Sequence, residues 1–467
     1  MHRWLVRNIL FPLQERIKGH PTPEILREME RVDRFSASEL ERYCNQKLST
    51  FIESCYSRVP YVSACMKCAG VTPAEIQTPA DLARLPIMTK AVVRQHRQGL
   101  RSTAAGKLSK FSTGGSTGEP LVFDLSKRRI ASRVACRQRV AQWWGLSVGH
   151  PELALWGSPI ELTRQDWARK VRDWLMATRL LPAFDMTEAA MARYLDIMEQ
   201  GHWEQIFGYP SSLYQLCLYA RKQGRALRRA GIRVVFVTSE VLFPYQRELI
   251  SEMLGCPVAN GYGGRDSGFI AHECPQGGMH ILTDAVIVEV VDPQGRPLPP
   301  GEPGEIVATD LYSEEAPFLR YATGDVGALS TRQCGCGRAL PLIERIVGRS
   351  NDCIMAPDGR NIHDLALVYP LREIEGIDSF RIHQLTIKQL HVQIVRNEHF
   401  RGDSEEKLRK SWRALLRAPV EITFEYLPRL LADRSGKFRH IISDLVEHRE
   451  LESLEGAAGE VKGKDRD

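Results

Sequence analysis

The sequence has no stretch suited to crossing a membrane and no export signal. It contains no run of about eighteen apolar residues, so we expect no bilayer-spanning helix. The N-terminal stretch is apolar, but Arg3, Arg7 and Glu15 interrupt it and no small-residue cleavage site follows, which argues against a signal peptide. The eleven cysteines lack the spacing of a secreted disulfide scaffold. We therefore expect reduced thiols and a cytoplasmic location.

The same N-terminal stretch could still meet a membrane from one side. In an amphipathic helix Trp4, Ile9 and Phe11 would lie on an apolar face beside basic residues, as in helices that rest on a bilayer surface. Packing of this helix on its own domain is the simpler interpretation, and we favour it. Weak peripheral contact with a membrane is the alternative.

The sequence also lacks a dense basic segment. Its 63 Lys and Arg residues against 57 Asp and Glu residues give a net charge of +6 over 467 residues. No basic cluster interleaves with aromatic side chains. We therefore expect no nucleic-acid partner, because such partners are bound by clustered basic groups.

Helix and strand patterns indicate an α/β protein with two domains. Residues 21–100 have apolar spacings of three and four, typical of helices. Short apolar strands such as VVFVTSE and CPVANGYG then alternate with helices, which favours a mixed or parallel sheet covered by helices, and residues 281–309 predict an antiparallel appendage. We predict a large N-terminal domain over 1–347 that includes this small β appendage, a small mobile α+β domain over 348–452, and a disordered tail over 453–467.

A loop rich in glycine and hydroxyl groups is the most informative segment. Its glycines let the backbone turn tightly and point N–H groups at an anion, and its hydroxyls add further donors. It lacks Gly-Lys-Ser/Thr and leads into a strand, so it is not the common P-loop. We predict phosphate binding, with positive charge supplied by magnesium and a residue elsewhere, and a flexible linker is the alternative. The loop contains Ser112, Thr113, Gly114, Gly115, Ser116, Thr117 and Gly118.

Five segments resemble, in the same order, motifs of the adenylate-forming superfamily, which includes acyl-CoA ligases, firefly-luciferase-like enzymes and peptide-synthetase adenylation domains. The segments are FSTGGSTGEP, NGYGGRD, YATGD, GRSND and SGKFR, and they span residues 111–439. The helical opening with SRVPYV also resembles the phenylacetate–CoA ligase and CapK-like capsule-synthesis branch. The resemblance implies a large domain, a mobile small domain and a site for ATP and AMP.

The resemblance implies that the NGYGGRD segment lies at the centre of the nucleotide site. Tyr262 offers a flat face for adenine beside Gly263. Asp266, which replaces the usual Glu, is the expected magnesium ligand, and Arg265, which replaces the usual Thr, would add a cation against phosphate. A surface Arg–Asp pair in a strand-end turn is the structural alternative.

Further nucleotide contacts come from the same resemblance. Ser239 and Glu240 would line the adenine edge. Asp325 would accept hydrogen bonds from both ribose hydroxyls, and Arg349 would donate to ribose or phosphate. Asp352 falls where relatives hinge the small domain.

Lys437 in SGKFR resembles the adenylation lysine of the family. The substrate carboxylate must approach the α-phosphate, so a cation between the two anions stabilises the transition state. On a mobile domain this lysine can withdraw afterwards, which lets a second nucleophile reach the acyl carbon. Lys437, Asp266 and Arg265 are therefore the predicted catalytic residues.

Two separate segments carry the ligand types of a structural zinc site. Cys274 and His280 follow the tyrosine motif, and Cys334 and Cys336 precede the hinge. Three thiolates and one imidazole suit tetrahedral zinc, and a closed set of four indicates a structural role. His272 could replace His280, and the sequence leaves this choice open.

These assignments predict an AMP-forming acid–thiol ligase that activates a small carboxylic acid with ATP and transfers it to coenzyme A. The alternative acceptor is an amine or a carrier-protein thiol in polysaccharide or natural-product biosynthesis. A relative without activity, acting as a binding or scaffold protein, is a third hypothesis, which the departures at Arg265, Asp266 and Asn351 support. The candidate walls of the acid pocket are Trp143, Trp144, Trp156 and residues 207–210.

Overall fold

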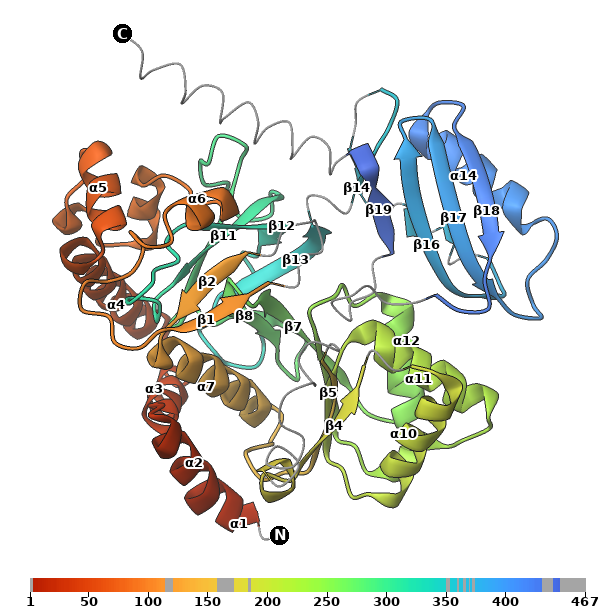
Figure 1. The fold of residues 1–467 in the computed structure, drawn as a ribbon, viewed down its shortest axis with the longest axis horizontal. Helices are drawn as coiled ribbons and strands as arrows, with labels where there is room; N and C mark the ends of the chain where they lie inside the picture. The colour runs from red at the N-terminus through yellow and green to blue at the C-terminus, as the bar shows by residue number, and fades with distance from the viewer. Residues whose placement is uncertain are drawn as a thin grey trace. The chain divides into compact units, whose positions relative to one another are not determined.

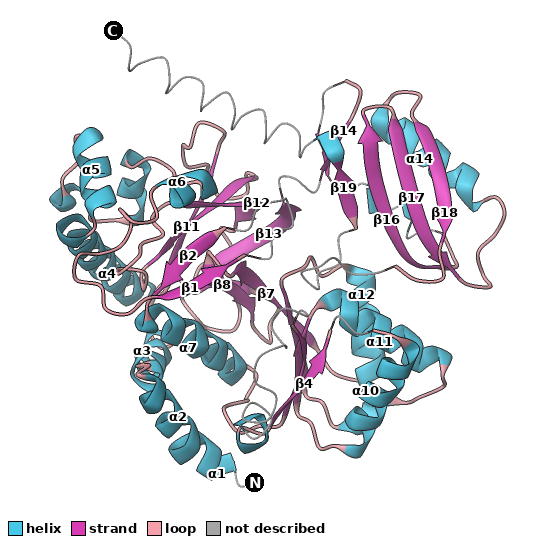
Figure 2. Cartoon of the chain, viewed as in Figure 1, coloured by secondary structure: helices cyan, strands magenta, loops and turns pink. Residues whose placement is uncertain are grey.

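The computed structural model describes residues 3–113, 121–157, 172–183, 186–349, 353–358, 361–363, 367–368, 370–371, 374–430 and 440–445. They fall into two compact units, the first mainly residues 1–346 and the second mainly residues 347–467, with Gly324–Val326 grouped with the second. Figures 1 and 2 show the elements of both units. The predicted tail over 453–467 lies outside the described residues.

Helices open the first unit, as the apolar spacing predicts. The N-terminal helix runs through α1 (Arg3–Leu5), a π-helical turn (Val6–Leu10) and α2 (Phe11–Lys18). It is followed by α3 (Thr22–Val32), α4 (Ala37–Arg58), α5 (Pro60–Cys68) and α6 (Lys90–Gln95). A capping box at Ser36 begins α4, and Pro60 occupies the first turn of α5, where its missing N–H costs nothing.

A hairpin and a long helix lead from these helices into the main sheet. β1 (Ser109–Ser112) pairs antiparallel with β2 (Val122–Leu125). The side chain of Ser126 then caps α7 (Lys127–Trp143) by accepting from the Arg129 N–H. The predicted phosphate loop therefore connects two paired strands.

An 11-stranded mixed sheet organises the first unit, in the order β10-β11-β12-β13-β9-β8-β7-β6-β5-β3-β4. The strands β4, β3, β5, β6 and β7 pair in parallel, and β7, β8 and β9 pair antiparallel. The strand bounds are β3 (Glu152–Trp156), β4 (Thr178–Pro182), β5 (Gln205–Gly208), β6 (Val234–Thr238), β7 (Val258–Gly264), β8 (Gly268–Glu273), β9 (Met279–Ile281), β10 (Val286–Val291), β11 (Gly304–Asp310), β12 (Tyr321–Leu329) and β13 (Leu342–Arg349).

Helices cover the parallel strands on both faces, which explains why these strands are apolar along their length. On one face, α10 (Glu188–Gln200), α11 (Pro210–Lys222) and α12 (Pro244–Leu254) bury Leu195, Leu216 and Ile250 against Ile206 and Val235. On the other face α7 packs against a small cluster around Phe236. The predicted α/β fold with a helix-covered mixed sheet is confirmed, and β10 and β11 form the predicted antiparallel appendage.

The second unit is a small α+β structure. Its sheet has the order β18-β17-β16-β19, and α14 (Ser404–Leu416) buries Trp412 and Leu408. A separate two-stranded ribbon joins β14 (Cys353–Met355) to β15 (Asn361–His363). The remaining strands are β16 (Ile377–Thr386), β17 (Gln389–Arg396), β18 (Glu421–Tyr426) and β19 (Ile441–Ser443).

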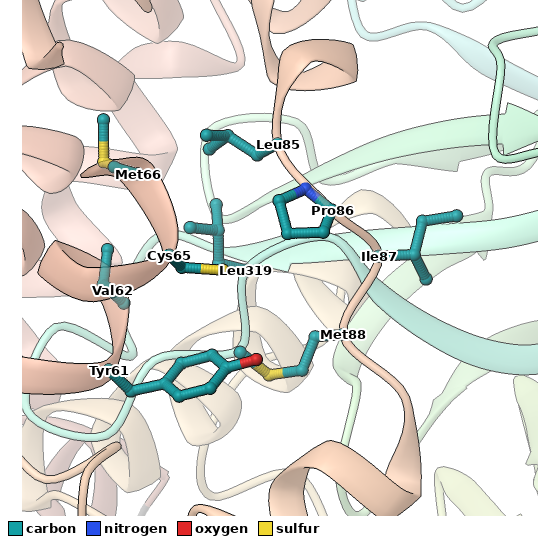
Figure 3. Close-up of a pocket in the computed structure, with 9 residues that line it drawn as sticks. All are labelled: Tyr61, Val62, Cys65, Met66, Leu85, Pro86, Ile87, Met88 and Leu319. Carbon is teal, nitrogen blue, oxygen red and sulfur yellow. The ribbon is translucent and has the colours of Figure 1, made fainter. Parts of the chain in front are cut away.

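An apolar hollow lies among the N-terminal helices (Figure 3). It is bordered by α5, by the segment before α6 and by Leu319, and its wall includes Tyr61, Cys65 and Met88. None of the predicted site residues lines it, so it belongs to the packing of the helical region. No helix among the described residues is both long and apolar enough to span a bilayer.

Candidate functional site

The base of the glycine loop is closed by residues at its two ends. The Thr113 N–H donates to the Leu121 carbonyl at 3.0 Å, and the Leu121 N–H donates back to Thr113 Oγ1 at 3.0 Å. Arg265, in the turn between β7 and β8, donates through Nη1 to the Ser112 carbonyl at 3.5 Å. Two of the predicted segments therefore meet at the base of this loop.

Asp266 is held in place by groups around it. Tyr321 Oη donates to Asp266 Oδ2 at 2.7 Å, and the Ser267 N–H donates to Oδ1 at 3.0 Å. Arg129, from the first turn of α7, donates to the Asp266 backbone carbonyl at 2.5 Å and forms a buried ion pair with Asp310. The carboxylate is thus oriented on both oxygens, and each oxygen keeps a lone pair for a further partner.

Tyr262 lies next to the strand that carries the ribose motif. Its hydroxyl donates to Thr323 Oγ1 at 3.4 Å, and Thr323 donates to the Ile306 carbonyl at 2.8 Å. Asp325 follows two residues later on the same strand, β12. Gly263 is required by close packing, because a Cβ there would lie 2.3 Å from the Gly268 carbonyl oxygen. The Tyr262 side chain on β7 therefore reaches β12 at Thr323, although three strands separate β7 from β12 in the sheet order.

Ser239 and Glu240 follow β6 directly. Ser239 has φ +74°, a left-handed conformation that is uncommon for a residue with a side chain and that gathers at functional sites. Glu240 accepts from the Ser211 N–H at 3.0 Å, in the first turn of α11. The Glu240 carboxylate thus helps to cap a helix as well as bordering the predicted site.

The structure gathers the four predicted zinc ligands. The ligand atoms of Cys274, His280, Cys334 and Cys336 all lie within 4.8 Å of one another. Cys274 and Cys334 Sγ are 3.5 Å apart, and His280 Nε2 lies 3.1 Å from Cys336 Sγ. A Cβ on Gly278 would lie 2.7 Å from Cys334 Sγ, so this approach needs glycine. The three thiols and one imidazole match the donor set of a closed tetrahedral zinc site.

His280, and not His272, is the histidine of this cluster. His280 Nδ1 lies 3.0 Å from the Leu340 carbonyl, which leaves Nε2 free to face the thiols as a ligand. Burial, followed by nearby Arg338, lowers the pKa of His280, which favours the neutral imidazole that metals bind. His272 pairs opposite His280 in the sheet, but its ring stacks on Phe269 and its Nδ1 meets the Glu273 carbonyl.

Most of the aromatic candidates for the acid pocket lie together. Trp156 stacks on Tyr209 with ring centres 4.2 Å apart and contacts Phe207 at 5.0 Å. Phe207 and Trp144 both pack on the small cluster beneath α7. Trp143 is elsewhere: its indole donates to Asp33 and its ring meets His280 edge-on. Trp143 therefore lies apart from the other candidates, because on a helix consecutive residues point in different directions.

Comparisons with known proteins agree with this geometry. The CapK C-terminal domain model matches residues 354–444. The chain is 28% identical over 319 residues to phenylacetate–coenzyme A ligase of Thermus thermophilus, covering 66% of this chain and 70% of that protein. It is 22% identical to protein CapK of Staphylococcus aureus, covering 93% and 94%. A structure of 2-hydroxyisobutyryl-CoA ligase in the postadenylation state superposes with TM-score 0.74 at 19% identity, covering 91% and 94%. The predicted resemblance to the phenylacetate–CoA ligase and CapK-like branch is confirmed by these relatives, and the superposition confirms the fold.

Several predicted site residues fall outside the part of the chain that the structure describes. Gly114, Gly115, Ser116, Thr117, Gly118, Asp352 and Lys437 lie outside the described residues, and Arg349 is described only as the last backbone position of β13. Their roles remain predictions. Sequence reasoning also missed Arg129 and the role of Tyr321, which together position Asp266. Tyr321 opens the YATGD motif, so its place there was the signal that could have identified it.

Proposed function

We propose that this adenylate-forming enzyme joins a carboxylic acid to AMP, releases pyrophosphate and then transfers the acyl group to coenzyme A. The contact of Arg265 with the Ser112 carbonyl carries the proposal, because it brings the acidic turn to the base of the predicted phosphate loop. The similar phenylacetate–coenzyme A ligases of Thermus thermophilus and Escherichia coli support coenzyme A as the acceptor.

The residues around this turn have complementary tasks. Arg265 offers a cation toward the loop, where phosphate groups would gather negative charge. Asp266 would hold magnesium, which prefers carboxylate oxygens and would offset phosphate charge when bound. Tyr321 and Ser267 orient the carboxylate beforehand, so less reorganisation is needed at the moment of reaction.

The C-terminal motifs complete the proposal. We assign Lys437 the role of neutralising the approaching carboxylate and α-phosphate, Arg349 a contact to ribose or phosphate, and Asp352 the role of hinge. A hinge at Asp352 would let this lysine act in the first step and leave for the second. These roles rest on the motifs.

The test is pyrophosphate exchange with ATP over a panel of aryl and alkyl acids. Wild-type protein should exchange with at least one acid, and Lys437→Ala should lose most of that exchange while still consuming supplied acyl-adenylate and coenzyme A. Lys388→Ala, on an exposed turn of the second unit, is the matched control. Exchange that Lys437→Ala leaves intact would remove this lysine from the mechanism. Absence of exchange with every acid would favour the scaffold hypothesis.

A second acceptor is favoured by one observation, the likeness to CapK over 93% of the chain. An amine or a carrier-protein thiol would then replace coenzyme A. Adding coenzyme A, hydroxylamine or neither to a single-turnover reaction distinguishes the two, because only a true acceptor accelerates decay of the acyl-adenylate beyond the rate with a simple nucleophile.

We also propose that the cluster of Cys274, His280, Cys334 and Cys336 binds one structural zinc ion. The gathered donor atoms support it. Metal analysis of purified protein should find about one zinc per chain. A value well below one in protein prepared without chelator would retire the proposal.

A further inference from the structure

Three arginines follow each other at intervals of four residues along α7. Residues at this spacing lie on one side of a helix. The first, Arg129, reaches Asp310 and the Asp266 backbone. The third, Arg137, lies over the Phe207 ring at 4.2 Å. Arg133 is between them, so it sits between the proposed magnesium residue and the aromatic candidates for the acid pocket.

Arg133 differs from its neighbours in having two donor atoms without a partner. Among the residues that the structure describes, the ion pairs of α7 join Arg129, Arg137 and Arg139 to acidic groups, and none includes Arg133. Within this part of the chain, the Nε and Nη2 atoms of Arg133 are shielded from solvent and donate to no hydrogen-bond acceptor. Burial, and then the charge of Arg129, lower the pKa of Arg133 to about 9.

The unpaired atoms have a specific geometry. Nε and Nη2 form one edge of the guanidinium, and this edge binds a carboxylate through two parallel hydrogen bonds. Asp266 and Asp310 act on Arg133 through their charge, but Asp266 is taken by Tyr321 and Asp310 by Arg129. The Nε and Nη2 donors of Arg133 therefore lack hydrogen-bond acceptors. Leaving such donors unpaired where water is excluded raises the free energy of the folded protein.

We propose that Arg133 binds a second anionic group of the acid substrate, most suitably a distal carboxylate. The loop and Arg265 lie on the phosphate side of Asp266, whereas Arg133 lies one helical turn toward Phe207. The enzyme would then select diacids over acids of the same shape without the second charge. This inference rests on the proposed function and narrows its substrate class.

The test uses matched pairs of acids in the exchange assay with full-length protein. Glutarate is compared with glutaramate, and isophthalate with 3-carbamoylbenzoate. Wild-type protein should prefer a diacid to its monoamide, and Arg133→Met should lower kcat/KM for the diacid by about 10²-fold while changing the monoamide little. Arg133→Lys should keep part of the preference. Arg225→Met, which removes an exposed arginine paired with Asp196 and Glu199, is the control.

A second readout does not depend on turnover. Because Arg133 is unpaired without substrate, Arg133→Met should raise the thermal midpoint of the ligand-free protein, whereas loss of a structural contact would lower it. An unchanged diacid preference, a lowered midpoint, or an equal rise in KM for ATP with every acid would each overturn the inference. If no acid supports exchange in wild-type protein, the proposed function fails, and the midpoint still tests whether Arg133 is unpaired.

A separate observation concerns the N-terminal helix. It packs on the first unit through buried Val6, Phe11 and Glu15. On its outer side Trp4, Ile9, Leu13 and Ile17 are 59%, 44%, 52% and 78% exposed. Their spacings are five, four and four, and the spacing of five coincides with the π-helical turn Val6–Leu10. A π-turn bonds residues five apart, so it brings Trp4 into line with the others.

The surroundings of this apolar row are basic. Arg7, Arg16 and Lys18 are exposed on the same helix, while its one acid, Glu15, is buried and bonded to Thr22 and Lys18.

We infer that this helix docks on an anionic membrane surface. An apolar row flanked by Arg and Lys, with tryptophan at its end, fits the boundary between acyl chains and negatively charged headgroups. The expectation that this helix only packs on its own domain is therefore incomplete, since one face packs and the other stays apolar and exposed.

Co-sedimentation of the full chain with vesicles tests this inference. Phosphatidylcholine vesicles containing phosphatidylglycerol should bind the protein, pure phosphatidylcholine should bind much less, and salt should weaken binding. The triple variant Ile9→Ser, Leu13→Ser and Ile17→Ser should lose binding, whereas Leu385→Ser, which alters an exposed apolar residue elsewhere, should not. If the triple variant sedimented with the vesicles as much as the wild type does, the inference would be refuted. A dimer that the triple variant dissociates would instead assign the row to self-association.

Discussion

Replacing Tyr321 with Phe removes a single atom that orients Asp266. The ring is fully buried and contacts Phe318 at 4.8 Å, so the variant keeps its packing and loses only the hydroxyl. That hydroxyl donates to Asp266 Oδ2 at 2.7 Å. A hydrogen bond to a charged group contributes about 1.5–3 kcal/mol, which corresponds to roughly a tenfold to 150-fold change in rate.

We expect Tyr321→Phe to lower kcat/KM in pyrophosphate exchange within that range and to raise the magnesium concentration needed for half-maximal rate. Its free energy of unfolding should fall by no more than about 1.5–3 kcal/mol, because the Ser267 N–H still holds the other carboxylate oxygen. The measurements are exchange at varied magnesium and urea unfolding.

The matched control is Tyr312→Phe. Tyr312 is as deeply buried, and its hydroxyl accepts from Lys47 at 2.8 Å, away from Asp266. This variant should lose stability without a change in magnesium dependence. If Tyr321→Phe and Tyr312→Phe had the same exchange kinetics as wild type, the orientation of Asp266 would not matter, and the assigned role of this carboxylate would be refuted.

Three further predictions concern stability and metal content. Cys336→Ser should purify with less than half the zinc of wild type and a lower thermal midpoint, because three ligands hold zinc less tightly than four. Arg139→Met should cost about 3–5 kcal/mol in urea unfolding, because it leaves buried Asp284 without its partner. Burial alone would raise the pKa of Asp124, but Arg97 and Arg101 together outweigh burial and lower this pKa, so the stability that Asp124 contributes is present at neutral pH and is lost as pH falls below about 4. Asp124→Asn should be less stable at pH 7 by about 2 kcal/mol and should flatten the acid side of the stability curve.

Much of the architecture could be predicted from the sequence because it depends on local patterns. The alternation of apolar strands and helices indicated the covered sheet, and residues 281–309 showed two apolar strands around a turn-rich segment. The zinc ligands were also recognisable, since thiols and imidazole at short spacings have few other uses. The choice between His272 and His280 could not be made, because the two pair directly across β8 and β9 and only the position of Leu340 and Cys336 decides between them.

Other features depend on contacts between distant residues. Arg129 meets the Asp266 backbone across 137 positions, and no local pattern shows that the first turn of α7 will lie beside this residue. Trp143 and Trp144 have different surroundings because they are adjacent on a helix and point in different directions. The presence of aromatic residues in the sequence cannot show this difference. In the sequence, Arg133 looks like any arginine on a helix. Its unpaired donors are recognised only when the partners of its neighbours are known.

With zinc bound as proposed, the cluster of Cys274, His280, Cys334 and Cys336 would close a loop of about sixty residues without a disulfide. Without the metal, the Cys334–Cys336 turn would be held against β9 only through the residues that follow it, by the Ile281 N–H on the Pro341 carbonyl and by the pairing of β13 with β9. The strand that follows this turn, β13, leads straight into the GRSND segment. The supply of zinc would thereby set how soon a newly made molecule becomes active, even if the metal takes no part in the reaction.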